Sequence, residues 1–448
     1  MSKQHLGRWV IVLFLLAALP GMTAVMAQGQ EPGGKAPLPV VTERGESDAP
    51  EAYNKYESES NNTFGSADSL VVNDVMGGMI NSVGDIDYYT FIMPSYRHGM
   101  VLLDIEAQSI GSGLDSVVCL YAYDHSLVDC NDDSDGVDSI VFGAMWGSGG
   151  AGGSYPYYIS VRDFGDIHGG GDHFYELIVS NPLLISAAAA NLGTGNVAGI
   201  PFRSEDILAH SDLNTGGQKW IMFFDGSDVG IIKNVTNVAA GYWRHPEIFI
   251  SIMANQNVPG VGTVKPHDVL QFTGDFGPTT TGTFSMLLRG SDWGLTTASE
   301  KIDAFGTWSY GIGGGYEGTC WGFPLSTVGA ATVVRDGVTL KFADEDVPCM
   351  EEFYGLIGWR TYLDGSAATG LAGEDVNGVS MVDDLDGTGQ SGKLYLNIVG
   401  TGKIAGHPVT QKDIFAVNYP AYTWSNYVWR GPAHGWNYNI DAFEYKGW

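Results

Sequence analysis

Short apolar runs, separated by glycine, asparagine and aspartate, recur along the chain from residue 51 to its C-terminus. The runs are rich in Val, Ile, Tyr and Phe, as in DYYTFIM at 87–93 and LYLNIV at 394–399. Runs of this length and composition are typical of β-strands, and the residues between them favour turns. Beyond residue 27 no segment keeps a helical period, since the alanine run 187–190 is too short. The pattern therefore predicts an all-β protein.

The first 27 residues have a different pattern. Lys3 and Arg8 precede an apolar run that extends from Trp9 to Leu19, and small residues follow up to Ala27. This organisation predicts a secretory signal cleaved after Ala27, with an uncleaved N-terminal anchor as the alternative. Residues 28–50 combine Pro, Gly and charge without an apolar period, which predicts a flexible leader. No later segment approaches the ~20 apolar residues of a membrane span. We expect a secreted protein, extracellular or periplasmic.

The charge of the chain limits its partners. It has 51 acidic and 22 basic residues, which is a formal charge of −29. Removing residues 1–27 takes away two basic residues and no acidic ones, so the mature protein carries −31. Because nucleic-acid binding requires a basic surface, the sequence argues against a nucleic-acid partner. The mature chain is long enough for two or three domains with full cores.

Four cysteines are present, all after the predicted signal, and export would place them where disulfides persist. In VVCLYAYDHSLVDCN at 117–131, a two-residue turn at Asp124–His125 sets Cys119 opposite Cys130 on adjacent strands. A cross-strand bridge is geometrically allowed there. Cys320 and Cys349 are then the remaining pair. Because no C-x-x-C spacing occurs, a metal site built from these thiols is the weaker alternative.

Residues 51–181 carry four motifs in a characteristic order. They are an E-x-N-N start at Glu59, a D-x-D-Y-Y-x-F strand at Asp85, a D-D turn at Asp132 and a Y-Y-x-x-V strand at Tyr157. In this order they resemble the bacterial pre-peptidase C-terminal (PPC) domain and, more distantly, the collagen-binding domains of secreted collagenases. The resemblance implies a small jelly-roll-like β-sandwich, appended to secreted enzymes and surface proteins, without a catalytic role of its own.

The same resemblance implies a calcium site. In collagen-binding relatives, carboxylates of the leading segment and beside the D-Y-Y strand hold calcium, a hard cation that takes about six to eight oxygen ligands. The matching residues in this chain are Glu57, Glu59, Asn61, Asn62, Asp85 and Asp87. The alternative is that the two asparagines form a turn and the two glutamates are solvated. Ca²⁺ is the expected cofactor.

After residue 181 the chain repeats itself. A turn motif with a shared glycine occurs four times, as DGSDVG at 225–230, RGSDWG at 289–294, DGSAATG at 364–370 and RGPAHG at 430–435. Upstream of these turns lie similar openers, which are EDIL, HDVL, EDV and KDIF. Because the glycine is kept while its neighbours change, we expect it to have a positive φ. The acidic neighbours change to arginine in two units, which argues against a catalytic or calcium pair there.

The fourth repeat stops before its last strand, and the missing strand occurs at the start of this region. Residues 183–208 parallel residues 394–415, with Val197, Gly199 and Pro201 matching the same residue pattern at 404–408. We predict a circularly permuted domain over 182–448, in which Leu183–Ser186 completes the last repeat. Four units of about 60–75 residues fit a four-bladed β-propeller. A β-solenoid or two packed sandwiches are the alternatives.

Two glycine-rich stretches resemble catalytic motifs but lack essential parts. GTGQSGKL at 387–394 has Leu394 where a phosphate-binding loop needs a hydroxyl, and a strand rather than a helix follows. HGGGDH at 168–173 resembles the oxyanion loop of esterases, but no G-x-S-x-G occurs in the chain. A metal held by His168 and His173 is a further alternative, which a glycine-rich loop does not favour. We identify no catalytic residues, which predicts a protein that is not an enzyme.

The aromatic residues of the repeats form two groups. Trp220, Phe284 and Trp359 recur six positions before the turn glycine, which predicts that they belong to the core. The other group does not repeat and lies in or near connections, where aromatic rings can stack on sugars or peptide side chains. This group of candidate ligand-binding residues comprises Tyr242, Trp243, Trp308, Tyr310, Trp321, Trp429 and Trp436.

Together these features predict a secreted, noncatalytic binding or adhesion protein that recognises an extracellular polysaccharide or protein. Two alternatives remain. One is a secreted hydrolase with its site in the propeller-like domain, and the other is a structural component of the cell surface or matrix.

Overall fold

The computed structural model describes residues 54–94, 98–133, 138–146, 154–188, 194–241, 247–306, 322–335, 337–353, 356–367, 370–383, 392–419 and 421–445. In these ranges the structure is built from strands, and the predicted all-β class is confirmed. None of the described helices is long and apolar enough to cross a membrane. They are short 3₁₀ turns: η1 (Phe64–Ser66), η2 (Gln108–Ile110), η3 (Phe164–Asp166), η5 (Gly290–Trp293), η6 (Ala298–Glu300) and η7 (Gly431–His434). The predicted signal and leader lie outside the described residues.

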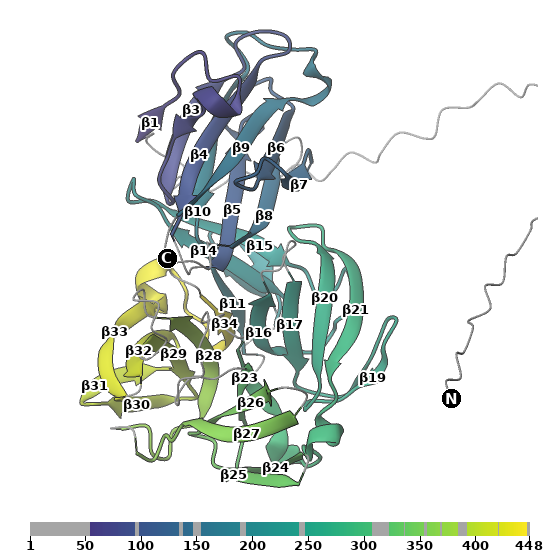
Figure 1. Cartoon of the computed structure of the whole chain (residues 1–448), viewed down its shortest axis with the longest axis vertical. Coiled ribbons are helices and arrows are strands. Elements are labelled where there is room, and N and C mark those ends of the chain that lie inside the picture. The colour runs from purple at the N-terminus through teal and green to yellow at the C-terminus, as the bar shows by residue number, and fades with distance from the viewer. Residues whose placement is uncertain are drawn as a thin grey trace, which may run out of the picture. The chain divides into compact units, whose positions relative to one another are not determined.

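The strands up to Ser180 form two five-stranded sheets (Figure 1). The first has the order β1 (Lys55–Tyr56), β3 (Asp74–Met79), β10 (Phe174–Ser180), β5 (His98–Glu106), β8 (Ile140–Trp146). The second has the order β2 (Asp68–Ser69), β4 (Ile86–Met93), β9 (Tyr155–Asp163), β6 (Ser116–Tyr121), β7 (Leu127–Asn131). Both sheets contribute to one apolar core, which is the arrangement of a β-sandwich.

Alternation along the strands positions the side chains of the sandwich. In β4 the buried positions are Asp87, Tyr89, Phe91 and Met93, while the residues between them are more exposed. A strand directs successive side chains to opposite faces, so the apolar members of this set place Asp87 on the inner face as well. A carboxylate is therefore carried into the edge of the core by the register of an otherwise apolar strand.

The predicted hairpin disulfide is confirmed. Cys119 in β6 lies opposite Cys130 in β7, and the two are bonded with their Cα atoms 4.1 Å apart. The turn is one residue longer than predicted, since the Ala122 N–H donates to the Ser126 carbonyl across a three-residue loop. A bulge opposite Leu120 and Tyr121 adds one residue to β7, which restores the register that places Cys119 opposite Cys130. Of the second predicted pair, Cys349 lies in β26, whereas Cys320 lies outside the described residues.

The strands from Leu183 onward form four four-stranded sheets. The first has the order β15 (Gln218–Phe224), β14 (Ile207–Asp212), β11 (Leu183–Ala187), β34 (Ile440–Glu444). The second has β16 (Val235–Gly241), β17 (Glu247–Ile252), β20 (Val269–Asp275), β21 (Thr281–Leu288). The third has β22 (Ile302–Phe305), β23 (Gly322–Thr327), β26 (Val347–Phe353), β27 (Leu356–Leu363), and the fourth has β28 (Val376–Asp383), β29 (Gly392–Ile398), β32 (Asp413–Tyr419), β33 (Thr423–Arg430).

Each sheet has a small hairpin associated with it. Along the chain, the hairpin lies between the two strands that occupy the middle of that sheet. The hairpins are β12 (Gly195–Val197) with β13 (Ile200–Phe202), β18 (Gln256–Val258) with β19 (Gly262–Val264), β24 (Ala331–Arg335) with β25 (Val338–Phe342), and β30 (Thr401–Ile404) with β31 (His407–Thr410). The V-x-G-x-P pattern of the sequence is the turn of such a hairpin, with positive φ at Ala198 and Gly199. The four-fold repeat seen in the sequence is therefore a repeat of one sheet and one hairpin.

The strand pairing predicted for the permuted repeat is confirmed. β11, near the start of the repeat region, pairs with β34, the last strand of the chain, with Leu184 opposite Glu444 and Ile185 opposite Phe443. Figure 1 shows this pairing as a yellow strand beside a teal one. No sheet of the described residues closes on itself, so the propeller stays a prediction.

The reason for the repeated turn glycine differs from the predicted one. Gly226, Gly290, Gly365 and Gly431 do not have a positive φ, so that prediction is wrong. Instead, a Cβ at each of these glycines would come too close to a backbone carbonyl oxygen. That oxygen belongs to the first residue of the opener that precedes the turn: Glu205, His267, Glu345 or Lys412. In three repeats the opener aspartate accepts the hydrogen bond of this glycine's N–H, as from Gly290 to Asp268 at 2.9 Å. The opener and the turn therefore pack directly against each other. Their backbones approach so closely that the position has no room for a side chain, which requires the glycine.

One edge strand of each four-stranded sheet has a β-bulge at a polar residue. The bulges fall at equivalent positions of β16, β22, β28 and β34, where the register with the neighbouring strand skips one residue. The skipped residues are all buried, with exposures of 2–4%: Thr236, Asp303, Asn377 and Asp441. A bulge re-aims a side chain without ending the ladder. Each sheet therefore directs one buried polar group away from its own pairing.

These four polar residues connect the sheets in a cycle. Each one interacts with a residue at or just before the neighbouring edge strand of the next sheet. Thr236 donates a hydrogen bond to the Ile302 carbonyl, and Asn377 donates one to the Ile440 carbonyl. Asp303 interacts with Asp375, and Asp441 interacts with Asn234. Burial, followed by the charge of Asp375, raises the pKa of Asp303 well above its usual value, so this carboxyl keeps a proton to donate. The last contact returns to the second sheet, where the cycle began.

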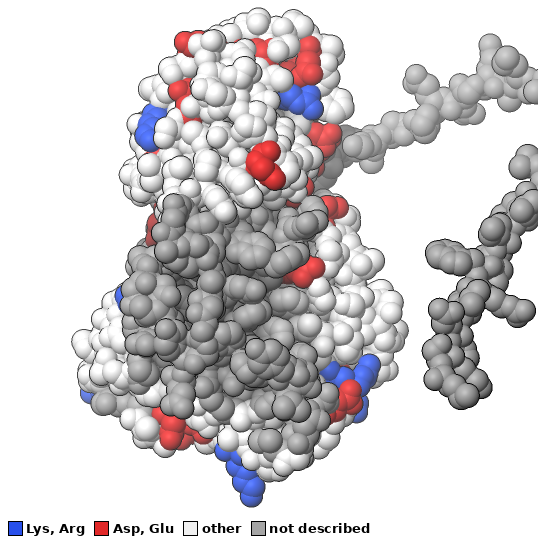
Figure 2. All heavy atoms as spheres, in the orientation of Figure 1, with Lys and Arg blue, Asp and Glu red and all other residues white. Residues whose placement is uncertain are grey.

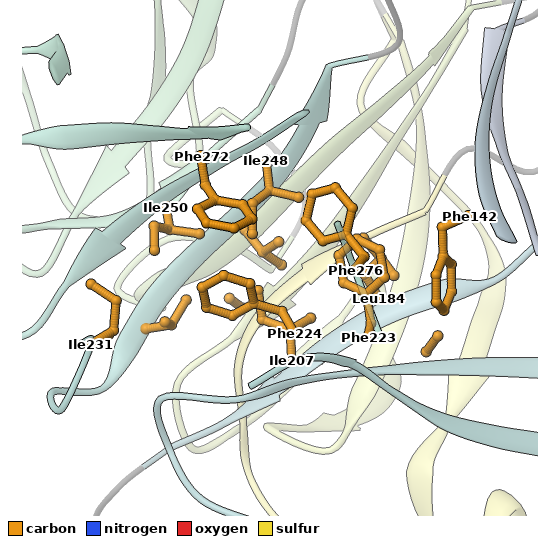
Figure 3. Packing of buried hydrophobic residues seen from close by; sticks show 14 of the residues in the cluster. Phe142, Leu184, Ile207, Phe223, Phe224, Ile231, Ile248, Ile250, Phe272 and Phe276 are labelled. Atoms are coloured by element: carbon orange, nitrogen blue, oxygen red, sulfur yellow. The ribbon is translucent and has the colours of Figure 1, made fainter. Parts of the chain in front are cut away.

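An apolar core joins the sandwich to the first two sheets of the repeat region (Figure 3). Met100 and Leu102 of β5 and Phe142 of β8 belong to this core, and the Phe142 ring packs edge-on against Phe223 with centroids 4.8 Å apart. The residues between them, such as Val101, face the core of the sandwich. The continuous apolar run in β5 reflects burial on both faces.

Candidate functional site

Three carboxylates meet at one edge of the sandwich. Glu57 and Glu59 follow β1, Asp87 lies in β4, and one oxygen atom of each lies within 4.8 Å of the others. Asp87 is fully buried, Glu57 is half-buried and Glu59 is exposed. We call these three residues the carboxylate cluster. It brings together three of the six residues predicted to bind calcium.

Backbone pairing holds the Glu57 side chain in place. β1 runs parallel to β3, and the Glu57 N–H continues this pairing by donating to the Gly77 carbonyl at 3.0 Å. The Glu57 carboxylate then accepts the Met79 N–H through Oε1 at 2.6 Å. This leaves Oε2 directed toward Asp87 and the tyrosines beside it.

Two buried tyrosines form the inner wall of the cluster. The Tyr175 hydroxyl donates to Asp87 Oδ2 at 2.6 Å, and the Tyr89 hydroxyl donates to Glu57 Oε2 at 3.0 Å. The two hydroxyls lie 2.5 Å apart. Gly78 makes room for Tyr175, because a Cβ at this position would overlap the tyrosine ring. Neither tyrosine was among the residues predicted for this site, although Tyr89 lies within the D-x-D-Y-Y-x-F motif.

The electrostatics of the cluster favour the binding of a positive charge. Burial, followed by the charge of Glu57, raises the pKa of Asp87 to about 9. Burial also raises the pKa of Glu57. Among the described residues, no Lys or Arg forms an ion pair with the cluster. Asp87 Oδ1 is buried and has no hydrogen-bond partner within the described ranges. A proton or a cation must therefore neutralise the buried carboxylates.

The other three predicted ligands lie next to the cluster but have partners of their own. Asp85 accepts from Asn62 Nδ2 at 2.5 Å and from the Asn81 N–H at 2.7 Å. Asn61 is fully buried, and its Nδ2 lies 3.4 Å from Asp68. Its Oδ1 has no partner in the described part of the chain and is the one further oxygen here that is buried and unpaired.

The predicted ligand-binding aromatics are less exposed than expected where the structure describes them. Trp429 in β33 is 5% exposed, and Trp436, just after η7, is fully buried. Both pack in a core with Trp220, and this burial corrects the expectation that they are available for stacking on a ligand. Trp220, Phe284 and Trp359 are buried, as predicted for core residues. The remaining candidates lie outside the described residues: Tyr242, Trp243, Trp308, Tyr310 and Trp321.

The glycine-rich loop at 168–173 does bring its histidines together. The rings of His168 and His173 stack with centroids 5.8 Å apart, and Asp163 lies beside them. Asp163 Oδ2 accepts the His168 N–H at 3.0 Å and the Ile167 N–H at 3.3 Å. His168 is mostly exposed, and these local hydrogen bonds account for the position of the carboxylate.

No family model and no curated protein matches the chain. Among solved structures, the chain is similar to the pre-peptidase C-terminal domain of a collagenase from Bacillus anthracis. The two are 17% identical, with a TM-score of 0.20 over 25% of this chain and 94% of that one. At this TM-score the similarity establishes neither a fold nor a function for the chain.

Proposed function

We propose that the protein is a secreted, noncatalytic binding protein whose N-terminal sandwich holds calcium at the carboxylate cluster. The observation that carries the calcium site is the buried, unpartnered Asp87 Oδ1 beside Glu57 and Glu59. Carboxylate and amide oxygens are the ligands calcium prefers. Glu57, Glu59 and Asp87 would hold the ion. Asn61 Oδ1 is a further buried oxygen without a hydrogen-bond partner among the described residues, and it was predicted as a ligand. The positive charge would replace the proton that burial otherwise retains on Asp87.

Calcium is expected to stabilise the protein, and to do so more strongly as the pH rises. Asp87 has a folded pKa of about 9, far above its unfolded value, so without metal its contribution to stability is lost as the pH rises toward 9. A cation that binds only the folded state raises the melting temperature by mass action. Calorimetry with calcium or chelator at pH 6 and pH 8 should show the larger difference at pH 8.

Two variants make this test specific. Asp87→Asn should abolish both the calcium effect and the pH dependence that arises from this residue. Asp124→Asn is the matched control, because Asp124 is exposed and its carboxylate accepts hydrogen bonds from Ser126 in its own turn. A melting temperature that does not change with chelator at pH 8 in the unmutated chain would remove calcium from the proposal.

We propose further that the four sheets are the blades of a four-bladed propeller that carries the binding surface. The proposal is supported by the cycle of contacts between the bulge residues and by the pairing of β11 with β34. A propeller gathers loops from several blades on one face, which suits recognition of an extended polymer. A nucleic acid is not the proposed ligand, because the chain carries a formal charge of −29. On the face shown in Figure 2, the described Lys and Arg side chains are few and scattered.

Retention on immobilised extracellular polysaccharides and proteins tests this function. The mature chain is expected to bind one polymer without cleaving it. Trp243→Ala and Trp308→Ala should each weaken retention about tenfold or more, as for aromatic residues central to an interface, and should leave the melting temperature unchanged. Trp359→Ala is the control for misfolding, since it should lower the melting temperature. Turnover of a peptide, ester or glycoside that a single substitution abolishes would favour the hydrolase alternative.

A further inference from the structure

A second group of metal-ligating side chains lies in the repeat region, far in sequence from the carboxylate cluster. His210 and Asp212 lie in β14, and His434 ends η7. One ligand atom of each lies within 4.8 Å of the others. A strand directs residues i and i+2 to the same side, which places His210 and Asp212 together. His434 joins them because β34, which follows η7, pairs with β11 beside β14.

The distances within this group match the edges of a small coordination polyhedron. His434 Nδ1 lies 3.2 Å from Asp212 Oδ1, and His210 Nε2 lies 3.6 Å from the same oxygen. A tetrahedral zinc ion with bonds of about 2.0–2.1 Å separates its ligand atoms by roughly 3.3 Å. Two of the three distances between ligand atoms therefore lie near this spacing, and the third, between the two imidazole nitrogens, is at most 4.8 Å.

The burial of His210 supplies an independent reason to expect a ligand. This side chain is 2% exposed, and its Nε2 makes no hydrogen bond within the described part of the chain. A buried polar nitrogen without a partner costs about 1–3 kcal/mol. Nε2 is directed toward Asp212 but lies beyond hydrogen-bonding distance of it. An ion between the two groups would satisfy this nitrogen.

Aromatic rings enclose the histidines. His434 stacks on Trp429 with centroids 5.4 Å apart, and His210 packs on Trp220 at 4.5 Å. Trp436 lies parallel to Trp220 at 5.6 Å and completes the wall. An apolar shell fixes ligand orientation and excludes competing water. The Asp212 side chain is 58% exposed, compared with 19% for His434 and 2% for His210, so the group opens to solvent mainly on the Asp212 side.

We propose that His210 Nε2, Asp212 Oδ1 and His434 Nδ1 bind a divalent transition-metal ion, of which Zn²⁺ fits best. Two imidazoles with one carboxylate suit zinc rather than calcium, which takes oxygen ligands. The fourth position faces solvent on the Asp212 side and would hold water. The ion would link β14, in the first sheet of the repeat region, to η7, in the last repeat. It would thereby connect the beginning and the end of the repeat region.

The carboxylate cluster of the sandwich shares no residue with this group, so the two proposed metal sites can be tested independently.

Zinc titration of the metal-free full chain by calorimetry tests the proposal, with Co²⁺ absorption as the signature of tetrahedral coordination. We expect one strongly bound zinc per chain and a higher melting temperature with zinc. Removing one ligand should weaken binding by about 100-fold or more, since even outer-sphere partners are worth about 10–100-fold. Asp212→Asn is the mild variant, because this side chain is exposed, and His434→Ala is the second.

The control is His168→Ala, which removes a histidine from the other histidine-containing group, at Asp163 and His173. It should leave zinc affinity unchanged, and circular dichroism should show that all three variants are folded. Absence of zinc binding in the unmutated chain would mean that the group is only a contact between two histidines and a carboxylate, and would overturn the proposal. Unchanged affinity in folded Asp212→Asn and His434→Ala, or loss of binding in His168→Ala alone, would overturn it as well.

Discussion

Replacing Lys219 with methionine is expected to lower the free energy of unfolding by about 3–5 kcal/mol, as when one partner of a buried ion pair is removed. Lys219 lies in β15, and its ammonium group is 2.9 Å from Asp104 Oδ2 and also contacts Glu106. Both carboxylates lie on the face of β5 that packs against the repeat region. Methionine keeps the apolar volume and removes the ammonium group from beside both carboxylates.

The pH dependence of this variant follows from Asp104. Burial raises the pKa of Asp104 to about 6, and the charge of Lys219 opposes this rise. Without Lys219 the pKa of Asp104 rises further, so the variant loses more stability as the pH increases and the carboxyl must ionise. Urea unfolding at pH 5 and pH 8 should therefore show the larger deficit at pH 8.

The matched control is Arg162→Met. Arg162 pairs with Asp166 at 3.1 Å, and both side chains are about one-third or more exposed. An exposed pair of this kind contributes about 0–1 kcal/mol. If Lys219→Met costs no more than Arg162→Met, the ion pair between β5 and β15 does not stabilise the contact between the sandwich and the repeat region.

Ending the chain at Asn439 is expected to destabilise the repeat region by more than about 5 kcal/mol, because it removes two large core side chains that each contribute several kcal/mol. β34 supplies Ile440 and Phe443, which are buried, and Phe443 packs where Gly378 has no Cβ. The truncation also removes the carbonyl of Ile440 that accepts from Asn377. The edge of β11 would be exposed, which favours aggregation.

A chain that ends at Tyr445 is the control for this truncation, since it keeps all of β34. Its melting temperature should equal that of the full chain, whereas the chain ending at Asn439 should melt several degrees lower or fail to remain soluble. Equal melting temperatures for the two shortened chains would show that β34 does not hold the first sheet together.

The strand pattern and the repeat were evident from the sequence because both are local. Apolar runs between glycine-rich turns specify strands wherever they occur, and four similar turns imply four similar sheets. The pairing of β11 with β34 could also be predicted, because the missing strand of the last repeat had a counterpart near residue 183. The cysteine register was predictable for a similar reason, although the bulge that corrects the turn was not.

The sequence identified the residue types of the carboxylate cluster but not their final partners. Glu57 and Asp87 were predicted as ligands from a resemblance, and the structure brings them together with Glu59. It also places Asn62 on Asp85 and adds Tyr89 and Tyr175, whose hydroxyls reach the cluster because β4 and β10 belong to the two sheets that share the core of the sandwich. Which oxygens remain unpaired depends on these neighbours.

The sequence by itself determined the fold class, the number of repeats and the positions of the turns, because period-two patterns and turn residues act over a few neighbouring residues. Only the tertiary structure decided why the turn glycine is kept, since its constraint is the carbonyl oxygen of a residue about 20 positions earlier. The burial of Trp436 and the meeting of His210 with His434 were decided in the same way. These contacts join segments far apart in the chain, and no local pattern records which distant segment will fill a given space.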